Sequence, residues 1–191
     1  MSKPLFVLVA GVNGSGKSTF TATFKRHYPN ILIIDPDAIA LEVTGCFATI
    51  NQAGNLAGRK ALEQIKYNID HKISFIAEST ISGRTYLKLV EKAKEAGFRT
   101  VLLYIGLETP ELSALRVASR VNKGGHDIPL QHIRRRHPKS LSNLLPHIRI
   151  FDIAHVYDNS NQRVWVAGYR KGTLVKQARS IPQWLVQLLK L

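Results

Sequence analysis

The 191-residue sequence is short of cysteine, of long apolar runs and of acidic side chains. Cys46 is its only cysteine, so an intrachain disulfide and a cysteine-based zinc cluster are excluded, which favours a reducing, cytoplasmic setting. No apolar run approaches the roughly 18 residues that a membrane span needs. The apolar opening, residues 3–10, leads into a glycine-rich turn and not into a small-residue cleavage site, so we expect a soluble, unprocessed protein with no membrane partner.

The shortage of acidic residues leaves a strong positive charge. The chain has 27 Lys and Arg but only 13 Asp and Glu, a formal net charge of +14. Residues 1–115 carry 13 basic and 10 acidic side chains (+3), whereas residues 116–191 carry 14 basic and 3 acidic ones (+11). Such a balance indicates anionic partners, from nucleotides to nucleic acids, and is no argument about fold.

Short apolar segments alternate with segments of helical period, a pattern typical of βαβ units with a parallel sheet. It predicts one α/β domain over residues 1–191, with three α/β/α layers and a mainly parallel sheet of about five strands. Strands are expected at residues 5–10, 31–35, 73–78, 100–106 and 153–158. Residues 110–149 predict two or three short helices broken by Gly124-Gly125, Pro129, Pro138 and Pro146. A β-hairpin and a helix are expected over about residues 163–191, where Trp165, Tyr169 and Trp184 are interpreted as packing residues.

The strongest motif lies between the first predicted strand and the helix after it. Residues 11–18 read GVNGSGKS, a complete P-loop pattern. Glycines in such a loop let backbone N–H groups surround a phosphate, the lysine reaches the β- and γ-phosphates, and the serine is placed to ligate Mg²⁺. We therefore predict that ATP and Mg²⁺ bind here, with Ser18 as the metal ligand. The predicted nucleotide-binding residues of the loop are Gly11, Asn13, Gly14, Ser15, Gly16, Lys17, Ser18 and Thr19.

Carboxylates follow the next two strands, at the edge where open α/β sheets bind ligands. Asp35 and Asp37 flank a proline after the second strand, and Asp37 is interpreted as a base that accepts the proton of an acceptor hydroxyl. The alternative is that either aspartate only caps the following helix. Glu78 closes the third strand and Thr80 follows it; both are predicted to contact substrate.

A basic segment in residues 110–149 has the features of a mobile lid. Arg116 and Arg120 are four residues apart and share one helical face, and a Gly-Gly pair and His126 follow. A lid of this kind would bring arginines over the phosphates and exclude water. Arg116, Arg120 and His126 are accordingly predicted to bind nucleotide, with Arg120 catalytic. The second lid cation is left open among His126 and residues 134–136, and a solvated basic face is the alternative.

Taken together, these residues resemble the zeta toxin family of P-loop kinases, and most closely its chromosomal members. The match covers about residues 4–150 and includes the P-loop, Asp35/Asp37, Arg59, Glu78/Thr80 and Arg120. The resemblance implies transfer of the γ-phosphate of ATP to the 3′-hydroxyl of UDP-N-acetylglucosamine, with Lys17, Asp37 and Arg120 as catalytic residues. The predicted substrate-binding residues are Asp37, Arg59, Glu63, Glu78, Thr80 and Arg84.

Two departures from the family pattern bear on specificity. The acidic substrate contact of the family aligns near Leu62, with Glu63 displaced by one position, and its second lid arginine falls close to His126. A nucleotide-sugar kinase is the expected function, and an antitoxin protein is a candidate partner. The alternatives are a kinase of another acceptor (a nucleoside, an antibiotic or an RNA 5′-hydroxyl) and a nucleic-acid-binding ATPase. Against the last, the sequence has no RNA-recognition, zinc-finger or basic-zipper pattern, and its aromatic residues do not interleave with the basic run.

Overall fold

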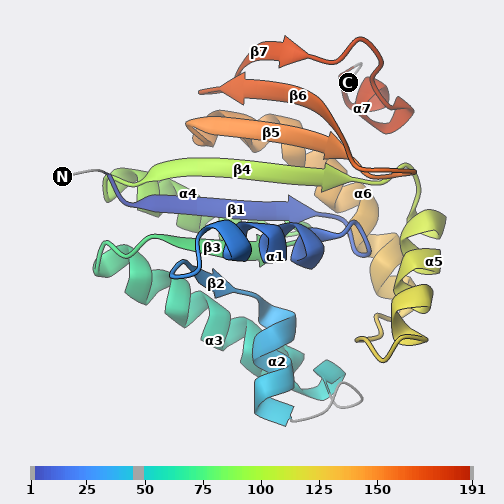
Figure 1. Cartoon of the computed structure of the whole chain (residues 1–191), viewed down its shortest axis with the longest axis horizontal. Helices are drawn as coiled ribbons and strands as arrows, with labels where there is room; N and C mark the ends of the chain where they lie inside the picture. Colours follow the sequence, from blue (N-terminus) through green and yellow to red (C-terminus); the bar gives the residue numbers. More distant parts are fainter. Residues whose placement is uncertain (1–2, 45–49, 190–191) are drawn as a thin grey trace.

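The computed structural model describes residues 3–44 and 50–189, so Cys46 lies outside the described residues. A single sheet runs through this part of the chain in the strand order β2-β3-β1-β4-β5-β6-β7 (Figure 1). The strands are β1 (Leu5–Gly11), β2 (Leu32–Ile34), β3 (Phe75–Ser79), β4 (Arg99–Gly106), β5 (Ile153–Asp158), β6 (Val164–Arg170) and β7 (Thr173–Gln177). The helices are α1 (Lys17–His27), α2 (Pro36–Thr44), α3 (Ile50–Asp70), α4 (Thr85–Glu95), α5 (Pro110–Val121), α6 (Leu130–His147) and α7 (Gln183–Leu189).

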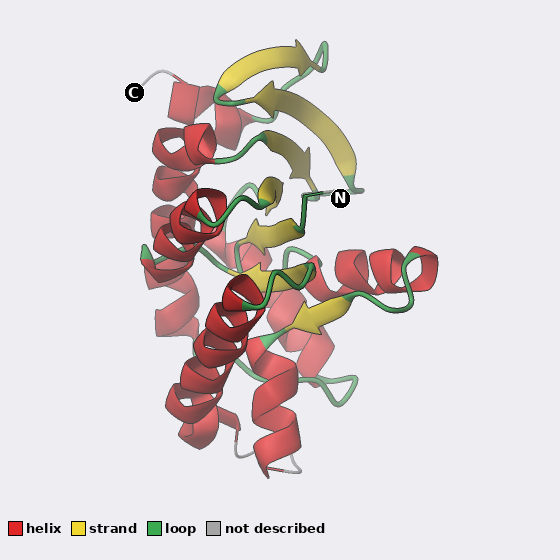
Figure 2. Cartoon of the chain, turned by 90° about the vertical axis from the view of Figure 1, so that its left-hand side faces the viewer, coloured by secondary structure: helices red, strands yellow, loops and turns green. Residues whose placement is uncertain are grey.

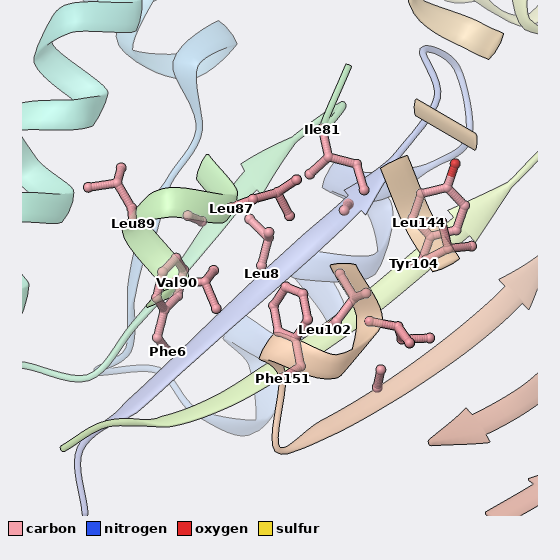
Figure 3. Close-up of a cluster of buried hydrophobic side chains, with 14 of the residues drawn as sticks. Phe6, Leu8, Ile81, Leu87, Leu89, Val90, Leu102, Tyr104, Leu144 and Phe151 are labelled. Carbon is pink, nitrogen blue, oxygen red and sulfur yellow. The ribbon is translucent and has the colours of Figure 1, made fainter. Parts of the chain in front are cut away.

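Helices cover both faces of the sheet, as the three-layer expectation requires (Figure 2). Alternate residues of β1 point to opposite faces, because side chains of a strand alternate. Phe6 and Leu8 join the larger apolar cluster, in which they lie near Val90 of α4 and Leu144 of α6 (Figure 3). Buried residues of α3 and α7 belong to the same cluster. Val7 and Val9 join a smaller cluster, against which Phe20 of α1 packs. The parallel strands β2, β3, β1, β4 and β5 therefore bring their carboxyl ends to one edge between two helical layers.

The sheet is larger than the sequence predicts. The predicted hairpin forms as β6 and β7, but β6 pairs antiparallel with β5, so the hairpin extends the sheet to seven strands. The helix after it, α7, buries Trp184 against Gly106, where a Cβ atom would lie 2.3 Å from the indole ring. Trp184 and Tyr169 are both buried, which confirms their interpretation as packing residues.

The prediction that Pro138 and Pro146 break the helical segment is wrong. The helix α6 is continuous from Leu130 to His147, although each proline removes a backbone donor. Tertiary contacts hold the helix around Pro138: His137 Nε2 lies 3.1 Å from the carbonyl oxygen of Leu107, and Ser140 Oγ lies 3.0 Å from the Tyr104 hydroxyl. The predicted breaks at Gly124-Gly125 and at Pro129 are confirmed, because both lie between the end of α5 and the start of α6. Among the described helices, none is long and apolar enough to cross a bilayer.

Candidate active site

A cleft of about 840 Å³ opens at the carboxyl edge of the parallel strands. Its walls come from the P-loop between β1 and α1, the start of α2, the residues after β3, the helix α5 and the start of α6. This is the edge at which open α/β sheets bind their ligands. Of the predicted site residues, the structure brings the following to the walls of this cleft: Asn13, Gly14, Gly16, Lys17, Ser18, Thr19, Asp35, Asp37, Glu78, Thr80, Arg116, Arg120, His126 and Arg136.

The P-loop has the backbone shape that its glycines permit. Gly14 and Gly16 have φ values of +71° and +91°, in the left-handed region that favours glycine. A Cβ atom at Gly11 would lie 2.1 Å from the carbonyl oxygen of Ile105, so the loop also packs too closely against β4 for a larger residue. Two buried polar atoms of the loop, Asn13 Oδ1 and Ser15 Oγ, have no hydrogen-bond partner among the described residues. The glycine conformations and the unused Ser15 hydroxyl donor suit a bound phosphate, whereas Asn13 Oδ1 can only accept a hydrogen bond.

Lys17 lies folded against its own loop. Its Nζ donates to the carbonyl oxygens of Gly11 and Val12, each at 3.1 Å. Burial lowers the pKa of the Lys17 ammonium, while the nearby carboxylates of Glu78 and the two aspartates after β2 act in the opposite direction. The carbonyl oxygens of Gly11 and Val12 are uncharged acceptors. A charged phosphate oxygen is therefore a better hydrogen-bond partner for the Lys17 ammonium than the loop itself.

Glu78 lines the cleft and is hydrogen-bonded to the first turns of α1. It is 3% exposed, and its carboxylate accepts hydrogen bonds from Ser18 Oγ at 2.9 Å and from Thr21 Oγ1. Burial and the charge of Asp35 raise the pKa of Glu78. Hydroxyl and carboxylate oxygens are the protein ligands that Mg²⁺ takes, directly or through water, so Ser18 and Glu78 fit a magnesium ion. Thr21 escaped the sequence analysis, although its position one helical turn after Ser18 was a usable signal.

The two aspartates after β2 differ in their hydrogen bonding and exposure. Asp35 Oδ1 accepts a hydrogen bond of 2.9 Å from the backbone N–H of Asp37, which is the capping geometry at the start of α2. Burial, together with the charge of Asp37, raises the pKa of Asp35. Asp37 is itself exposed and lines the cleft. Asp35 therefore caps α2 and also lines the cleft, while the role of Asp37 as a base stays a prediction.

The two arginines of α5, Arg116 and Arg120, donate hydrogen bonds to different loops. Arg116 Nη2 donates to the carbonyl oxygen of Ser160 at 2.9 Å, and Arg120 Nη2 donates to the carbonyl oxygen of His126 at 2.6 Å. The Arg120 Nε is buried with no partner among the described residues, as is His126 Nδ1. Gly125 is required by this arrangement, because a Cβ atom there would lie 2.6 Å from Arg120 Cγ. Arg120 therefore lines the cleft with Nη2 hydrogen-bonded to the loop after α5 and with Nε buried without a partner.

Of the four candidates for the second lid cation, the structure places only His126 and Arg136 at the cleft. Arg136 lines the cleft, whereas neither Arg134 nor Arg135 does. His126 also lines it and is 7% exposed, and burial lowers its pKa, so the ring is biased toward the neutral form. Arg136 is thus the better candidate for a permanent positive charge opposite the lid helix.

Three predicted substrate residues lie away from the cleft. Arg59 and Arg84 are exposed and do not belong to its walls, although Gly58, the neighbour of Arg59, does. Glu63 lies further along α3, in a different groove beside β2. The helical period accounts for this, since residues 58 and 63 of α3 do not share a face.

The sequence analysis also missed a residue on the acceptor side. Tyr86 of α4 lines the cleft, and its hydroxyl is buried with no hydrogen-bond partner among the described residues. Burial and the charges of Asp35 and Asp37 raise the pKa of Tyr86, so the hydroxyl keeps its proton and remains a donor. An isolated tyrosine in an amphipathic helix gives no sequence signal of this role.

Replacing Tyr86 by phenylalanine tests whether that hydroxyl contacts the acceptor. We expect Y86F to raise the KM for the acceptor about threefold to tenfold, the value of one neutral hydrogen bond, and to leave the KM for ATP unchanged. Steady-state kinetics with each substrate varied in turn measures the two constants. Y157F is the control, since Tyr157 packs against Phe20 on the other face of the sheet. Equal changes in both constants would contradict an acceptor contact.

A P-loop followed by carboxylates at the ends of two parallel strands, with a helical lid across the cleft, defines a P-loop kinase-like α/β protein. Comparison with known families makes this specific: the Zeta toxin family model matches residues 1–168, and the chain belongs to the Zeta toxin family. A relative from Haemophilus influenzae, an uncharacterized protein, is 35% identical over 131 residues, which are 69% of this chain and 91% of the relative.

Solved structures with the same fold include toxin and kinase chains. A chain of the PezAT chromosomal toxin–antitoxin system of Streptococcus pneumoniae has a TM-score of 0.66 at 19% identity, over 100% of this chain and 84% of that one. A chain of the AvrRxo1-ORF1:-ORF2 structure with ATP reaches 0.74 at 14% identity, over 98% and 63%. A gluconokinase from Sinorhizobium meliloti 1021 reaches 0.53 at 18% identity, over 83% and 84%.

Proposed function

We propose that the chain is a kinase that transfers the γ-phosphate of ATP, with Mg²⁺, to a hydroxyl of a nucleotide sugar, with UDP-N-acetylglucosamine as the first candidate. The observation that carries the proposal is that one cleft contains the P-loop, the Asp37 carboxylate and the Arg120 side chain. These are the parts that phosphoryl transfer needs: a phosphate cradle, a base for the acceptor and a cation for the transferred group. Membership of the Zeta toxin family and the fold shared with a gluconokinase support phosphotransfer.

In the proposed reaction Asp37 takes the proton of the acceptor hydroxyl as its oxygen forms a bond to the γ-phosphorus. The bond between that phosphorus and the bridging oxygen to the β-phosphate breaks, and ADP leaves with the electron pair. Lys17 turns from its loop carbonyls toward the phosphates, and Arg120 stabilises the charge on the transferred group. Magnesium, held by Ser18 and Glu78, would neutralise charge on the phosphates.

A nucleotide sugar suits the remaining charges of the cleft. Lys123 and Arg136 line it in addition to Lys17 and Arg120. An acceptor that carries its own diphosphate would use cations beyond those that the phosphates of ATP require. The similarity to a chain of a toxin–antitoxin system makes an antitoxin protein a candidate partner of this chain as well.

The test is phosphorylation of UDP-N-acetylglucosamine by the full chain with ATP and Mg²⁺, followed by mass spectrometry of the acceptor and by ADP release. We expect a product 80 Da heavier and strict dependence on the acceptor, and K17A serves as the inactive control. Turnover only with a nucleoside, an aminoglycoside or a 5′-hydroxyl RNA would overturn the nucleotide-sugar assignment. Failure of every acceptor in this panel, with ATP bound, would overturn the kinase proposal.

A further inference from the structure

The strands at one end of the sheet, β5, β6 and β7, have one side without a helix. Figure 1 shows α1 in front of β1 and β3 but no described helix in front of β5, β6 and β7, and the turned view of Figure 2 agrees. On their other side, Val156 of β5 and Val166 of β6 are buried in the larger apolar cluster together with Trp184 of α7. The α1 side of these three strands is therefore a surface that faces solvent.

The strand register shows which side chains lie on this surface. Tyr157 of β5 packs against α1, so it marks the α1 side of the sheet. Trp165 lies directly opposite Tyr157 across β5 and β6, and residues opposite each other in an antiparallel pair share a face. His155 pairs with Gly168, which pairs with Lys176, so these residues lie on the same side. We call the surface formed by His155, Tyr157, Trp165 and Lys176 the open face.

Trp165 is held in position on the open face. Its indole Nε1 donates to His155 Nδ1 at 3.3 Å. Gly168 makes room for the ring, since a Cβ atom there would lie 3.2 Å from Trp165 Cζ2. Trp184 is 2% exposed, whereas Trp165 is only partly buried. The open face therefore presents a large aromatic ring whose orientation is already fixed.

Cations surround this ring. The exposed Lys176 places its ammonium 6.0 Å from the centre of the Trp165 indole. The exposed Arg163, just before β6, places its guanidinium 4.5 Å from the centre of the Phe20 ring of α1. Positive charge and aromatic rings thus alternate across the boundary between α1 and the open face.

Acidic side chains are missing from the elements around the open face. Residues 159–191 contain six basic residues and no acidic one, and residues 1–34, which include α1, contain no acidic residue either. Asp158 of β5 follows Tyr157 and so points to the opposite side, where its Oδ1 accepts a hydrogen bond of 2.9 Å from Trp184 Nε1. Because α1, β6 and β7 offer no carboxylate to these cations, the surface is complementary to an anionic ligand.

We propose that the open face binds single-stranded nucleic acid, with a base stacked on Trp165 and phosphates paired with Lys176 and Arg163. Proteins that bind single strands combine aromatic rings for the bases with a basic surface for the backbone. A duplex covers the faces of its bases by stacking, so it offers nothing to the indole ring. An acidic peptide would satisfy the cations but would leave the fixed indole without a role.

The open face has no signature in the sequence, where aromatic residues do not interleave with the basic run. Trp165 and Lys176 belong to different strands, and the hairpin of β6 and β7 brings them together. Neither residue lines the catalytic cleft. The inference therefore does not depend on the proposed kinase activity.

Fluorescence titration of W184F tests the stacking contact, because this variant leaves Trp165 as the only tryptophan of the chain. The probe is a 5′-phosphorylated oligothymidylate of about ten residues, within the usual site size for single strands. An abasic strand with the same number of phosphates is the matched probe without bases. We expect saturable quenching by the oligothymidylate, much weaker binding of the abasic strand, and no displacement by a non-hydrolysable ATP analogue. If W184F does not fold, the wild-type chain replaces it, with W165F as the blank.

Fluorescence anisotropy of the labelled oligothymidylate measures the affinity of further variants. W165A should bind about fivefold more weakly or worse, the usual effect of losing one base–aromatic stack. K176Q should lower the slope of log K against log salt by about 0.7, the value of one phosphate contact on a single strand. K92Q is the matched control, because Lys92 is an exposed lysine of α4, which packs on the opposite side of the sheet.

Circular dichroism of each variant separates lost binding from lost folding. The proposal is overturned if the abasic strand binds as tightly as the oligothymidylate, if folded W165A binds as tightly as the wild-type chain, or if K92Q has the effect expected of K176Q. Tighter binding of polyglutamate than of the oligothymidylate would overturn it in favour of an acidic protein partner. A chain that phosphorylates its acceptor but binds no single strand would refute this inference and leave the proposed function intact.

Discussion

D37N is expected to lower kcat for acceptor phosphorylation by about 10²- to 10⁴-fold, the usual contribution of a general base. The amide has the shape of the carboxylate but cannot accept the hydroxyl proton. The affinity for ATP should change little, because Asp37 lies on α2 and the proposed phosphate site is the loop before α1. Single-turnover kinetics measures the chemical step, and fluorescence titration with a nucleotide analogue measures binding.

D35N is the matched control for this variant. Asparagine caps helices as well as aspartate does, so the hydrogen bond from the Asp37 N–H and the position of α2 should persist. We expect D35N to retain far more activity than D37N. A D37N enzyme with near-normal turnover, or a D35N enzyme with the larger loss, would assign the proton transfer to another group.

R120A is expected to lower kcat by about 10³-fold or more, because an arginine on the transferred phosphoryl group has effects of that size. Arg120 lines the same cleft as the P-loop, so its guanidinium lies beside the proposed position of the transferred phosphate. R120K should recover only part of the activity, since lysine lacks the planar fork of donors. Stopped-flow or quench-flow measurement of the γ-phosphate transfer gives the size of the loss.

Two controls separate catalysis from lid structure. Arg120 also donates to the His126 carbonyl, so the thermal midpoint of R120A must be measured together with its rate. R134A removes a charge from α6 outside the cleft and should leave kcat within about twofold, as expected of an exposed surface position. If R134A were as slow as R120A, the general charge of the lid would matter and not the contact of Arg120.

The parts of the fold that follow from local pattern could be predicted. The five parallel strands and the P-loop were found because apolar runs and glycines at fixed spacing have few other structural meanings. Pro138 misled the prediction, since the breaking effect of a proline is local, whereas the contacts of His137 and Ser140 come from residues 30 or more positions away. The pairing of β6 with β5 is likewise a tertiary choice that no local pattern specifies.

The candidate site shows the same division. Lys17, Ser18 and Asp37 were placed from motif position alone, and the structure brings them to one cleft. Glu63 was assigned from the resemblance, one position after Leu62 where the acidic contact of the family aligns, but a shift of one residue on a helix turns a side chain by about 100°. The hydroxyl of Tyr86 acquires its importance from lacking a partner, which only packing reveals.

The turn that follows β5 joins the phosphate loop to the first turns of α5. Asn159 Nδ2 donates to the Ser15 carbonyl in the P-loop at 2.9 Å, and the Ser160 carbonyl accepts from Arg116 of α5. Gly14 adds a close contact, since a Cβ atom there would lie 2.9 Å from the carbonyl oxygen of Ser113. These contacts attach the first turns of α5 to the phosphate loop. Arg116 and the first turns of α5 therefore keep a fixed position relative to the phosphate cradle, so a substitution at Asn159 would disturb both elements together.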